Sequence, residues 1–139
     1  MPAPDRAHIQ AANDATYAAW NAHDADAVAA IFAERAEMID TGNPEPIRGR
    51  DAIRARAADL LAAFGDLRLE CIELLIDPPC NADRWIVTGV HRGKFIGLAP
   101  TGNAIRVEGC TFSHFDERGL VDRDVNFWDV TALLFQLSS

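Results

Sequence analysis

The sequence of 139 residues contains few cysteines, no cluster of basic residues and no long apolar run. Its cysteines, Cys71, Cys80 and Cys110, are odd in number and lack a CxxC spacing, so we expect neither a disulfide framework nor a zinc site. The absence of an 18-residue apolar stretch argues against a transmembrane helix, and the first ten residues lack the apolar core of a secretory signal. We therefore expect a protein of the reducing cytoplasm.

Positive charge is also scarce. Lys and Arg number 13 against 21 Asp and Glu, which gives a net charge of -8. A chain without a basic patch is not expected to bind nucleic acid or an anionic membrane surface. The four histidines are scattered and predict no metal site. The GxSxG motif of serine hydrolases is absent. A phosphate-binding loop for a nucleotide is also absent, and we expect no cofactor.

Alanine and the strand-forming residues are divided unequally along the chain. Most alanines lie before residue 64, whereas Val, Phe, Trp and Gly are more frequent after it. Alanine favours helices, and the β-branched and aromatic residues favour strands. The sequence therefore predicts a single α+β domain over residues 1–139, with the helices first and the strands second.

Three helices are predicted in the first part. Apolar residues at helical spacing indicate a helix over 6–21, and Asp24 is expected to cap a second helix. The apolar face of this second helix is formed by Val28, Ile31 and Phe32. A third helix is expected over 50–64, with Gly65 at its C-terminal cap.

The strands are predicted mainly in the second part. A short strand over 37–40 and a turn over 41–46 precede the third helix. Four further strands are expected at 67–76, 84–96, 104–115 and 120–129. Short connections between consecutive strands indicate an antiparallel meander. Three helices on a curved antiparallel sheet form a cone-shaped barrel that encloses a cavity.

Two groups of segments resemble known families. The segments NAHD (21–24), DTGNPEPIRG (40–49) and DAIR (51–54) resemble the ketosteroid isomerases. The segments similar to the SnoaL-like polyketide cyclases are GVHRG (89–93), GLAPTG (97–102), WD (128–129) and QL (136–137). Both families belong to the nuclear transport factor 2-like superfamily. The resemblance implies the cone-shaped α+β fold, a homodimer and a small hydrophobic ligand.

The resemblance suggests a role for two residues. Asp40 stands where the ketosteroid isomerases have their general-base aspartate, which abstracts a proton next to a carbonyl group. Alternatively, Asp40 shapes the turn over 41–46. Asn126 stands where the cyclases have an acid/base aspartate, and its amide can donate to an oxyanion. The alternative for Asn126 is a polar strand residue with satisfied hydrogen bonds.

The oxyanion donors of the isomerases are not retained. Thr16 stands at the position of the family's tyrosine, with Tyr17 one residue away, and Thr111 stands at the position of the second acid. A single helical residue turns the side chain by about 100°, so Tyr17 is not expected to replace the tyrosine directly. Weaker acids at both places argue against steroid isomerisation.

Alternation along the strands indicates further candidates. If Asn126 faces the cavity, so do Asp122, Asp124 and Trp128. Asp124 is then a second candidate carboxylate. Its alternatives are a residue at the wetter end of its strand or a salt-bridge partner of Arg123 or Arg92.

His91 lies between Gly89 and Gly93 on the expected strand over 84–96. Its alternatives are a proton shuttle with Asp124 or Asp40 and a hydrogen-bonded residue at a sheet face or interface. Five aromatic residues are candidate walls of a substrate pocket, or alternatively parts of the core: Tyr17, Trp20, Phe64, Trp85 and Trp128.

Three functions remain open at this point. The first is a cofactor-independent isomerase or cyclase acting on a hydrophobic cyclic or polyketide-like molecule, with Asp40 as base and Asn126, together with Thr111, holding the enolate oxygen. The second is an epoxide hydrolase that uses Asp40, Asp124 and an arginine. Its candidate arginines are Arg92 and Arg106. The third is a non-catalytic module that binds a small molecule, which the replacement of strong acids by Thr111 and Asn126 favours.

Overall fold

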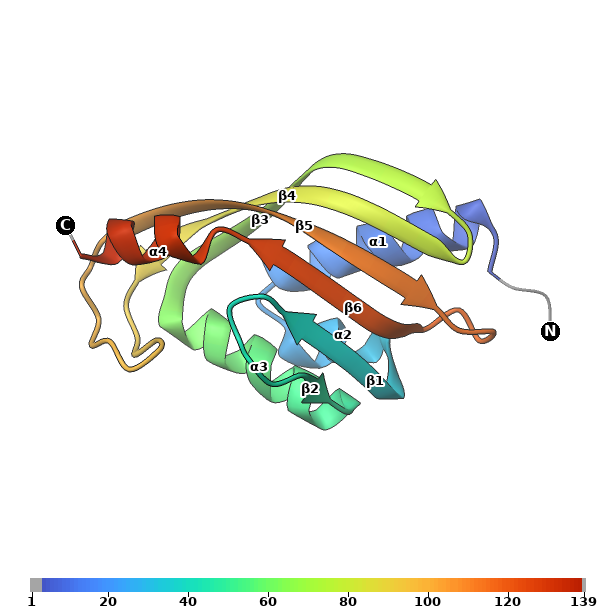
Figure 1. Ribbon diagram of the computed structural model, residues 1–139, viewed down its shortest axis with the longest axis horizontal. Coiled ribbons are helices and arrows are strands. Elements are labelled where there is room, and N and C mark those ends of the chain that lie inside the picture. Colours follow the sequence, from blue (N-terminus) through green and yellow to red (C-terminus); the bar gives the residue numbers. More distant parts are fainter. Residues whose placement is uncertain (1–3, 139) are drawn as a thin grey trace.

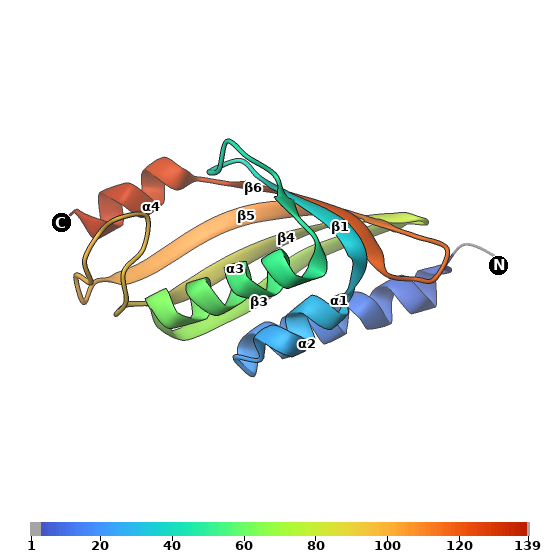
Figure 2. The ribbon, with the colours of Figure 1, turned by 90° about the horizontal axis from the view of Figure 1, so that it is seen from below.

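The computed structural model describes residues 4–138 and has two layers. Helices α1 (Arg6–Asn21), α2 (Ala25–Ala30) and α3 (Arg50–Ala63) lie on one side of a curved sheet, as Figure 2 shows. A fourth helix, α4 (Val130–Leu137), follows the last strand at the far end of the molecule (Figure 1). The predicted α+β class is confirmed.

The sheet contains six strands. They are β1 (Phe32–Asp40), β2 (Ile47–Arg48), β3 (Phe64–Asp77), β4 (Cys80–His91), β5 (Ala104–Phe115) and β6 (Val121–Trp128). Their order in space is β2-β1-β6-β5-β4-β3, and β3 to β6 form the predicted antiparallel meander.

The prediction of a purely antiparallel sheet is wrong, because β1 runs parallel to β6. The chain passes through β2, α3 and three strands before it returns beside β1, and so long a connection permits a parallel pair. The sheet also stays open, since β2 and β3 form its two edges. The cone is therefore a curved mixed sheet covered by helices.

The boundary between α2 and β1 differs from the prediction. Asp24 acts as the predicted N-cap of α2, because its side chain accepts a hydrogen bond from the backbone N–H of Ala27. However, α2 ends at Ala30, and Phe32 begins β1 opposite Val121 of β6. Strand β1 therefore begins five residues before the predicted strand over 37–40. Pairing with β6, which is distant in the sequence, extends it.

Gly65 does not cap α3. The chain passes directly from the helix into β3 at Phe64, whose backbone N–H bonds to the carbonyl of Leu60. Gly65 lies within β3, where it pairs with Val90 of β4. A glycine after a helical stretch signals a cap only when the chain turns there, and here strand pairing begins first.

The strand predicted over 84–96 is shifted towards the N-terminus. It begins at Cys80 and ends at His91. The backbone N–H groups of Arg92 and Gly93 bond to the carbonyl of Ala63, at 2.9 and 3.0 Å, instead of continuing the ladder. The predicted alternation therefore stops at His91.

Helix α4 is not expected from the sequence. The helix has only eight residues, most of them apolar, and the predicted strand over 120–129 ends at its N-cap, Asp129. Asp129 caps the helix by accepting a hydrogen bond from the N–H of Ala132. Leu133 and Leu137 pack into the apolar cluster that includes Phe64 and Phe95, so tertiary contacts stabilise this short helix.

Two apolar clusters form the core. One joins α1, α2, α3 and β1 through fully buried residues such as Ile9, Val28 and Ile53, and the other lies below α4. Among residues 4–138, no helix combines the length and the apolar character needed to span a bilayer.

Gly109 of β5 is required by close packing. A Cβ atom at this position would meet the ring of Trp85 and would lie 2.8 Å from the carbonyl oxygen of Phe127. We expect Gly109→Ala to lower the free energy of unfolding in urea by about 1–3 kcal/mol, because the indole must move away from the sheet. Gly65→Ala is the matched control, since its Cβ would meet only the flexible side chain of Arg92. Equal stability of the two variants would contradict this packing.

Candidate active site

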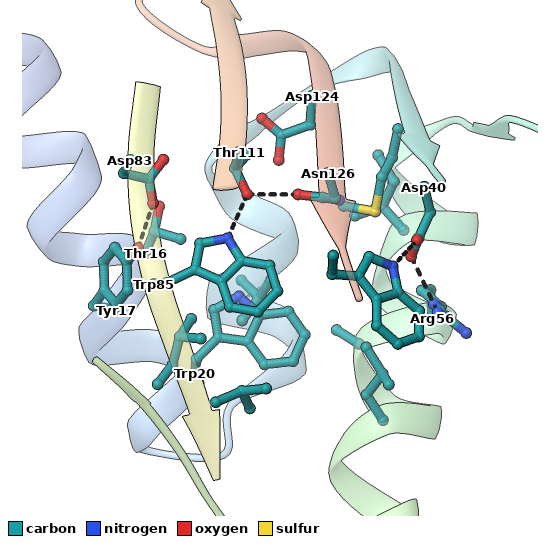
Figure 3. A pocket seen from close by; sticks show the side chains of 18 of the residues that line it. Thr16, Tyr17, Trp20, Asp40, Arg56, Asp83, Trp85, Thr111, Asp124 and Asn126 are labelled. Atoms are coloured by element: carbon teal, nitrogen blue, oxygen red, sulfur yellow. Dashed lines mark hydrogen bonds and ion pairs between the residues drawn. The ribbon is translucent and has the colours of Figure 1, made fainter. Parts of the chain in front are cut away.

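A cavity of about 190 Å³ lies between the helices and the concave face of the sheet (Figure 3). Its walls are mostly apolar, with a group of polar side chains on β1, β4, β5 and β6. Ten of the predicted site residues line it: Thr16, Tyr17, Trp20, Asp40, Phe64, Trp85, Thr111, Asp124, Asn126 and Trp128. Asp122, which was expected on the same face, does not line the cavity. Its carboxylate binds Nδ1 of His114 at 2.6 Å. Asp122 lies at the register shift between β5 and β6, where the regular alternation of side chains is interrupted.

Four polar residues form one row across four strands. Asp83 pairs with Thr111, Thr111 pairs with Asn126, and Asn126 pairs with Asp40 in the strand register. Residues in register on neighbouring strands point to the same face and lie about 5 Å apart. The row therefore places two carboxyl groups, a hydroxyl and an amide along one line of the cavity wall.

A hydrogen-bond relay orients the amide of Asn126. The indole N–H of Trp85 donates to Oγ1 of Thr111 at 2.8 Å, and Thr111 donates to Oδ1 of Asn126 at 2.7 Å (Figure 3). Because an indole N–H can only donate, the hydroxyl proton of Thr111 is directed to Asn126, whose amide oxygen must face it. The Nδ2 group of Asn126 has no hydrogen-bond partner among the described residues and is free to donate to a ligand.

Asp40 shapes the turn after β1 and also lines the cavity. Its Oδ1 accepts hydrogen bonds from the backbone N–H of Gly42 at 3.2 Å and from the indole of Trp128, so it shapes the turn. It also lines the cavity, where Oδ2 is 3.1 Å from Nη2 of Arg56. Arg56 lies on α3 three residues after Ile53, and this helical spacing is the signal that could have identified it.

Asp124 is buried rather than placed at the wetter end of its strand. Its Oδ1 accepts a hydrogen bond from the hydroxyl of Ser113 at 2.6 Å. Burial raises the pKa of Asp124 to about 7, and the hydrogen bond from Ser113 opposes this shift. The charge of Asp83 raises the pKa further. A carboxyl group with a pKa near 7 exchanges protons readily at neutral pH.

The sequence did not reveal the pair formed by Tyr17 and Asp83. The Tyr17 hydroxyl on α1 donates directly to Oδ2 of Asp83 on β4 (Figure 3). Burial raises the pKa of the Asp83 carboxyl, which the hydrogen bond from Tyr17 partly offsets. Burial also raises the pKa of Tyr17, so its hydroxyl remains a donor. Asp83 falls two residues before Trp85, and extending the strand alternation backwards would have found it.

Two predicted candidates have other roles. The hydroxyl of Thr16 bonds to the carbonyl of Ala12 one turn earlier in α1, at 2.9 Å. His91 is fully buried but does not line the cavity. Its Nδ1 lies 3.1 Å from Oγ1 of Thr101, and its ring packs on Phe64. The structure therefore brings His91 to neither Asp40 nor Asp124.

The aromatic side chains contribute to the core and to the cavity together. Phe64 belongs to the apolar cluster below α4, and Trp20 and Trp128 pack against that cluster. All three also line the cavity. Among residues 4–138, no group of three or more His, Cys, Asp and Glu side chains could hold a metal ion.

The family model described as SnoaL-like polyketide cyclase matches residues 10–137. The chain belongs to this family. No curated protein sequence matches it significantly. Because the match covers nearly the whole chain, the cavity described above is the cavity of a SnoaL-like domain.

Three solved structures illustrate the likeness. A proposed SnoaL-like polyketide cyclase from Jannaschia sp. CCS1 has a TM-score of 0.88 and 18% identity, over 100% of this chain and 97% of that one. AclR, a proposed hydroxylase from Streptomyces galilaeus, has a TM-score of 0.84 and 25% identity, over 96% and 83% of the chains. IdmH, a proposed polyketide cyclase from Streptomyces antibioticus, has a TM-score of 0.78 and 20% identity, over 94% and 99%.

Proposed function

We propose that this SnoaL-like protein is a cofactor-independent enzyme of the isomerase and cyclase kind, which moves a proton next to a carbonyl group of a small hydrophobic molecule. The observation that carries the proposal is the orientation of Asn126. The relay from Trp85 through Thr111 leaves its Nδ2 group facing the cavity, directly beside Asp40 in the strand register. A donor for a carbonyl oxygen and an acceptor for a proton thus lie side by side.

The reaction begins with proton transfer to Asp40. The carboxylate takes the proton from the carbon next to the carbonyl group, using a lone pair that its three donors leave free. The electron pair of the broken C–H bond moves into the carbonyl group, and charge gathers on its oxygen. Nδ2 of Asn126 donates to this oxygen and stabilises the enolate. In an isomerisation, Asp40 then returns the proton to a different carbon.

A cyclisation needs an acid as well, and Asp124 supplies it. The enolate carbon forms a bond with a second carbonyl carbon, and the carboxyl proton of Asp124 moves to the oxygen of that group. Exchange with solvent then returns Asp40 to its ionised form and Asp124 to its acid form. Asp40 faces the cation Arg56 whereas burial raises the pKa of Asp124, and such contrasting environments separate a base from an acid.

The cavity limits the size of the substrate. A volume of about 190 Å³ suits one or two small rings, since about 150 Å³ accommodates benzene. Trp20, Trp85 and Trp128 offer flat apolar walls for such rings.

Hydrogen exchange in D2O tests the proposal directly. Small cyclic β-diketones are incubated with the protein, and NMR follows deuterium uptake at the carbon between the carbonyl groups. We expect uptake above the buffer rate with the wild type and a large loss with Asn126→Leu, which removes the donor. Uptake at the buffer rate for every compound would contradict the proposed activity and would favour the binding module.

The relay predicts that Thr111 positions Asn126 without touching the substrate. We expect Thr111→Val to lower kcat for exchange about tenfold with little change in KM, because the amide of Asn126 is no longer held in one orientation. The matched control is Thr88→Val, which makes the same change on β4 outside the cavity. If Thr111→Val raises KM and leaves kcat unchanged, Thr111 contacts the substrate itself.

An epoxide hydrolase is the second candidate, and the ion pair of Asp40 with Arg56 favours it. The expected arginines do not take part: Arg92 pairs with exposed Asp66 at 3.7 Å, and the Arg106 side chain does not line the cavity. Arg56 supplies instead the arginine of an acid–arginine–acid set with Asp40 and Asp124. Incorporation of oxygen from labelled water into the product would identify hydrolysis and exclude isomerisation.

The homodimer and the cytoplasmic location remain proposals. The outer face of the sheet exposes Phe112 and Phe127, at 54% and 49% of their surface, and a second copy could cover them. The three cysteines are free thiols, which is consistent with a reducing compartment.

A further inference from the structure

A second group of polar residues in the cavity begins at Asp83, which ends the row of four that includes Asn126 and Asp40. Asn81 and Asp83 lie two residues apart on β4 and point to the same face. Asn81 is in register with Ser113 of β5, which in turn is in register with Asp124 of β6. Asp83 and Asp124 contribute four carboxyl oxygen atoms, and Asn81 contributes an amide oxygen. These atoms lie at the end of the cavity nearest the β3–β4 turn.

Asn81 has an unused acceptor. Its Oδ1 is buried and has no hydrogen-bond partner among the described residues, although only 4% of the residue is exposed. Leaving a buried polar atom without a hydrogen-bond partner destabilises the protein. Asn81 lines the cavity, so a ligand that donates a hydrogen bond there would remove this cost.

The charges of the cavity are not balanced. Its titratable and charged lining groups are Tyr17 on α1, Asp40 on β1, Arg56 on α3, Asp83 on β4 and Asp124 on β6. The single cation among them, Arg56, is bound to Asp40 at 3.1 Å. Asp83 and Asp124 therefore face the cavity without a cationic partner among the described residues.

The environment of the two carboxyl groups reflects this lack of a cation. Burial raises the pKa of Asp83 and that of Asp124, and the charge of Asp83 raises the pKa of Asp124 further. A cation between them would reverse these effects by stabilising both ionised forms. The aromatic rings of Tyr17 on α1 and Trp85 on β4 line the same cavity, and the face of an aromatic ring attracts cations.

We propose that Asn81, Asp83 and Asp124 form a binding site for the protonated amine of the substrate. The ammonium group donates to Oδ1 of Asn81 and to the two carboxylates, while the ring of the molecule fills the apolar part of the cavity. The inference rests on the proposed function, because it narrows the substrate of that same cavity to a carbonyl compound that carries an amine. It assigns a specificity site that the isomerisation does not require, and with the amine bound Asp124 is ionised and does not act as the acid of a cyclisation.

Calorimetry with matched ligands tests this site. Benzylamine and benzyl alcohol have the same ring and nearly the same size, but only the amine is protonated near neutral pH. We expect the wild type at about pH 8 to bind benzylamine at least about tenfold more tightly than the alcohol. The preference decreases as the pH falls below about 7, because Asp124 then takes up a proton. Asp83→Asn/Asp124→Asn removes the preference, and Asn81→Leu weakens it.

Controls separate the site from the overall negative charge of the protein. Glu73→Gln removes one carboxylate that is 64% exposed on the surface and should leave the preference unchanged. The single Asp83→Asn and Asp124→Asn variants serve if the double variant does not fold. Equal affinity for the amine and the alcohol at about pH 8 would overturn the proposal and indicate a neutral hydroxyl group as the donor. A preference that survives the substitutions would also overturn it.

The two proposals can fail independently. Exchange of β-diketone protons without a preference for amines leaves the proposed function standing and removes the amine site. A preference for amines without exchange supports the amine site and contradicts the proton-transfer activity.

Discussion

Replacing Asp40 with asparagine is expected to lower the rate of substrate proton exchange by about 10²- to 10⁴-fold. An amide cannot accept the proton at neutral pH, whereas it can still accept hydrogen bonds from Gly42 and Trp128. The turn therefore keeps its shape while the base is lost. NMR measurement of kcat for deuterium uptake by a small β-diketone checks this prediction.

The fold of this variant needs its own control. Asp40→Asn leaves Arg56, which is 22% exposed, without its carboxylate, and an unpaired and largely buried cation destabilises a protein. Asp40→Asn/Arg56→Met removes both charges together. If both variants are folded and inactive, the loss is chemical. Wild-type exchange in a folded Asp40→Asn variant would contradict Asp40 as the base and leave Asp124 as the candidate.

Replacing Asp124 with asparagine is expected to remove a large pH dependence of stability. The pKa of Asp124 is about 7 in the folded protein against 3.8 for an ordinary aspartate. The folded state therefore binds a proton that the unfolded chain has already released. This contribution to stability is complete below about pH 4 and is lost as the pH rises through about 7, and its full size is about 4 kcal/mol.

Urea unfolding at several pH values measures this contribution. The free energy of unfolding of the wild type, relative to that of Asp124→Asn, should fall by about 4 kcal/mol between about pH 4 and about pH 8. Asp26→Asn, at a carboxylate whose side chain is 85% exposed, should follow the wild type. A constant difference between the wild type and Asp124→Asn would mean that Asp124 titrates normally, and it would remove the acid from the proposed cyclisation.

The proposed mechanism and the pH dependence of stability have the same physical origin. Asp40 is surrounded by donors and a cation, whereas Asp124 is buried with one hydroxyl donor. Burial of Asp124 costs stability above its pKa but keeps an acid available at neutral pH. A ligand amine at the second polar group would offset that cost by stabilising the carboxylate.

Local patterns in the sequence determined much of the fold and part of the site. Helices α1 and α3 follow from apolar residues that recur at helical spacing. This pattern is local, because the residues that form it are close together in the sequence. The alternation that places Asp124, Asn126 and Trp128 on one face is also local, because it depends only on the direction of successive side chains along a strand. The resemblance to the ketosteroid isomerases added Asp40.

Only the tertiary structure decided which groups meet. The parallel pairing of β1 with β6 sets Asp40 beside Asn126, and the fold of α3 over the sheet brings Arg56 to Asp40. The position of α1 joins Tyr17 to Asp83 across 66 residues of sequence. The end of β4 at His91 keeps this histidine out of the cavity.

The physical reason is the range of the interactions. The periodicity of helices and strands depends on residues a few positions apart, so it can be recognised in one sequence without knowledge of the fold. Partner choice depends on strand register and helix placement, which are set by the burial of the whole core. The α+β class and the residues that share a face of a strand were therefore readable from the sequence. The face that lines the cavity and the partners of Asp40, Asn126 and Asp83 depend on how the sheet curves and pairs.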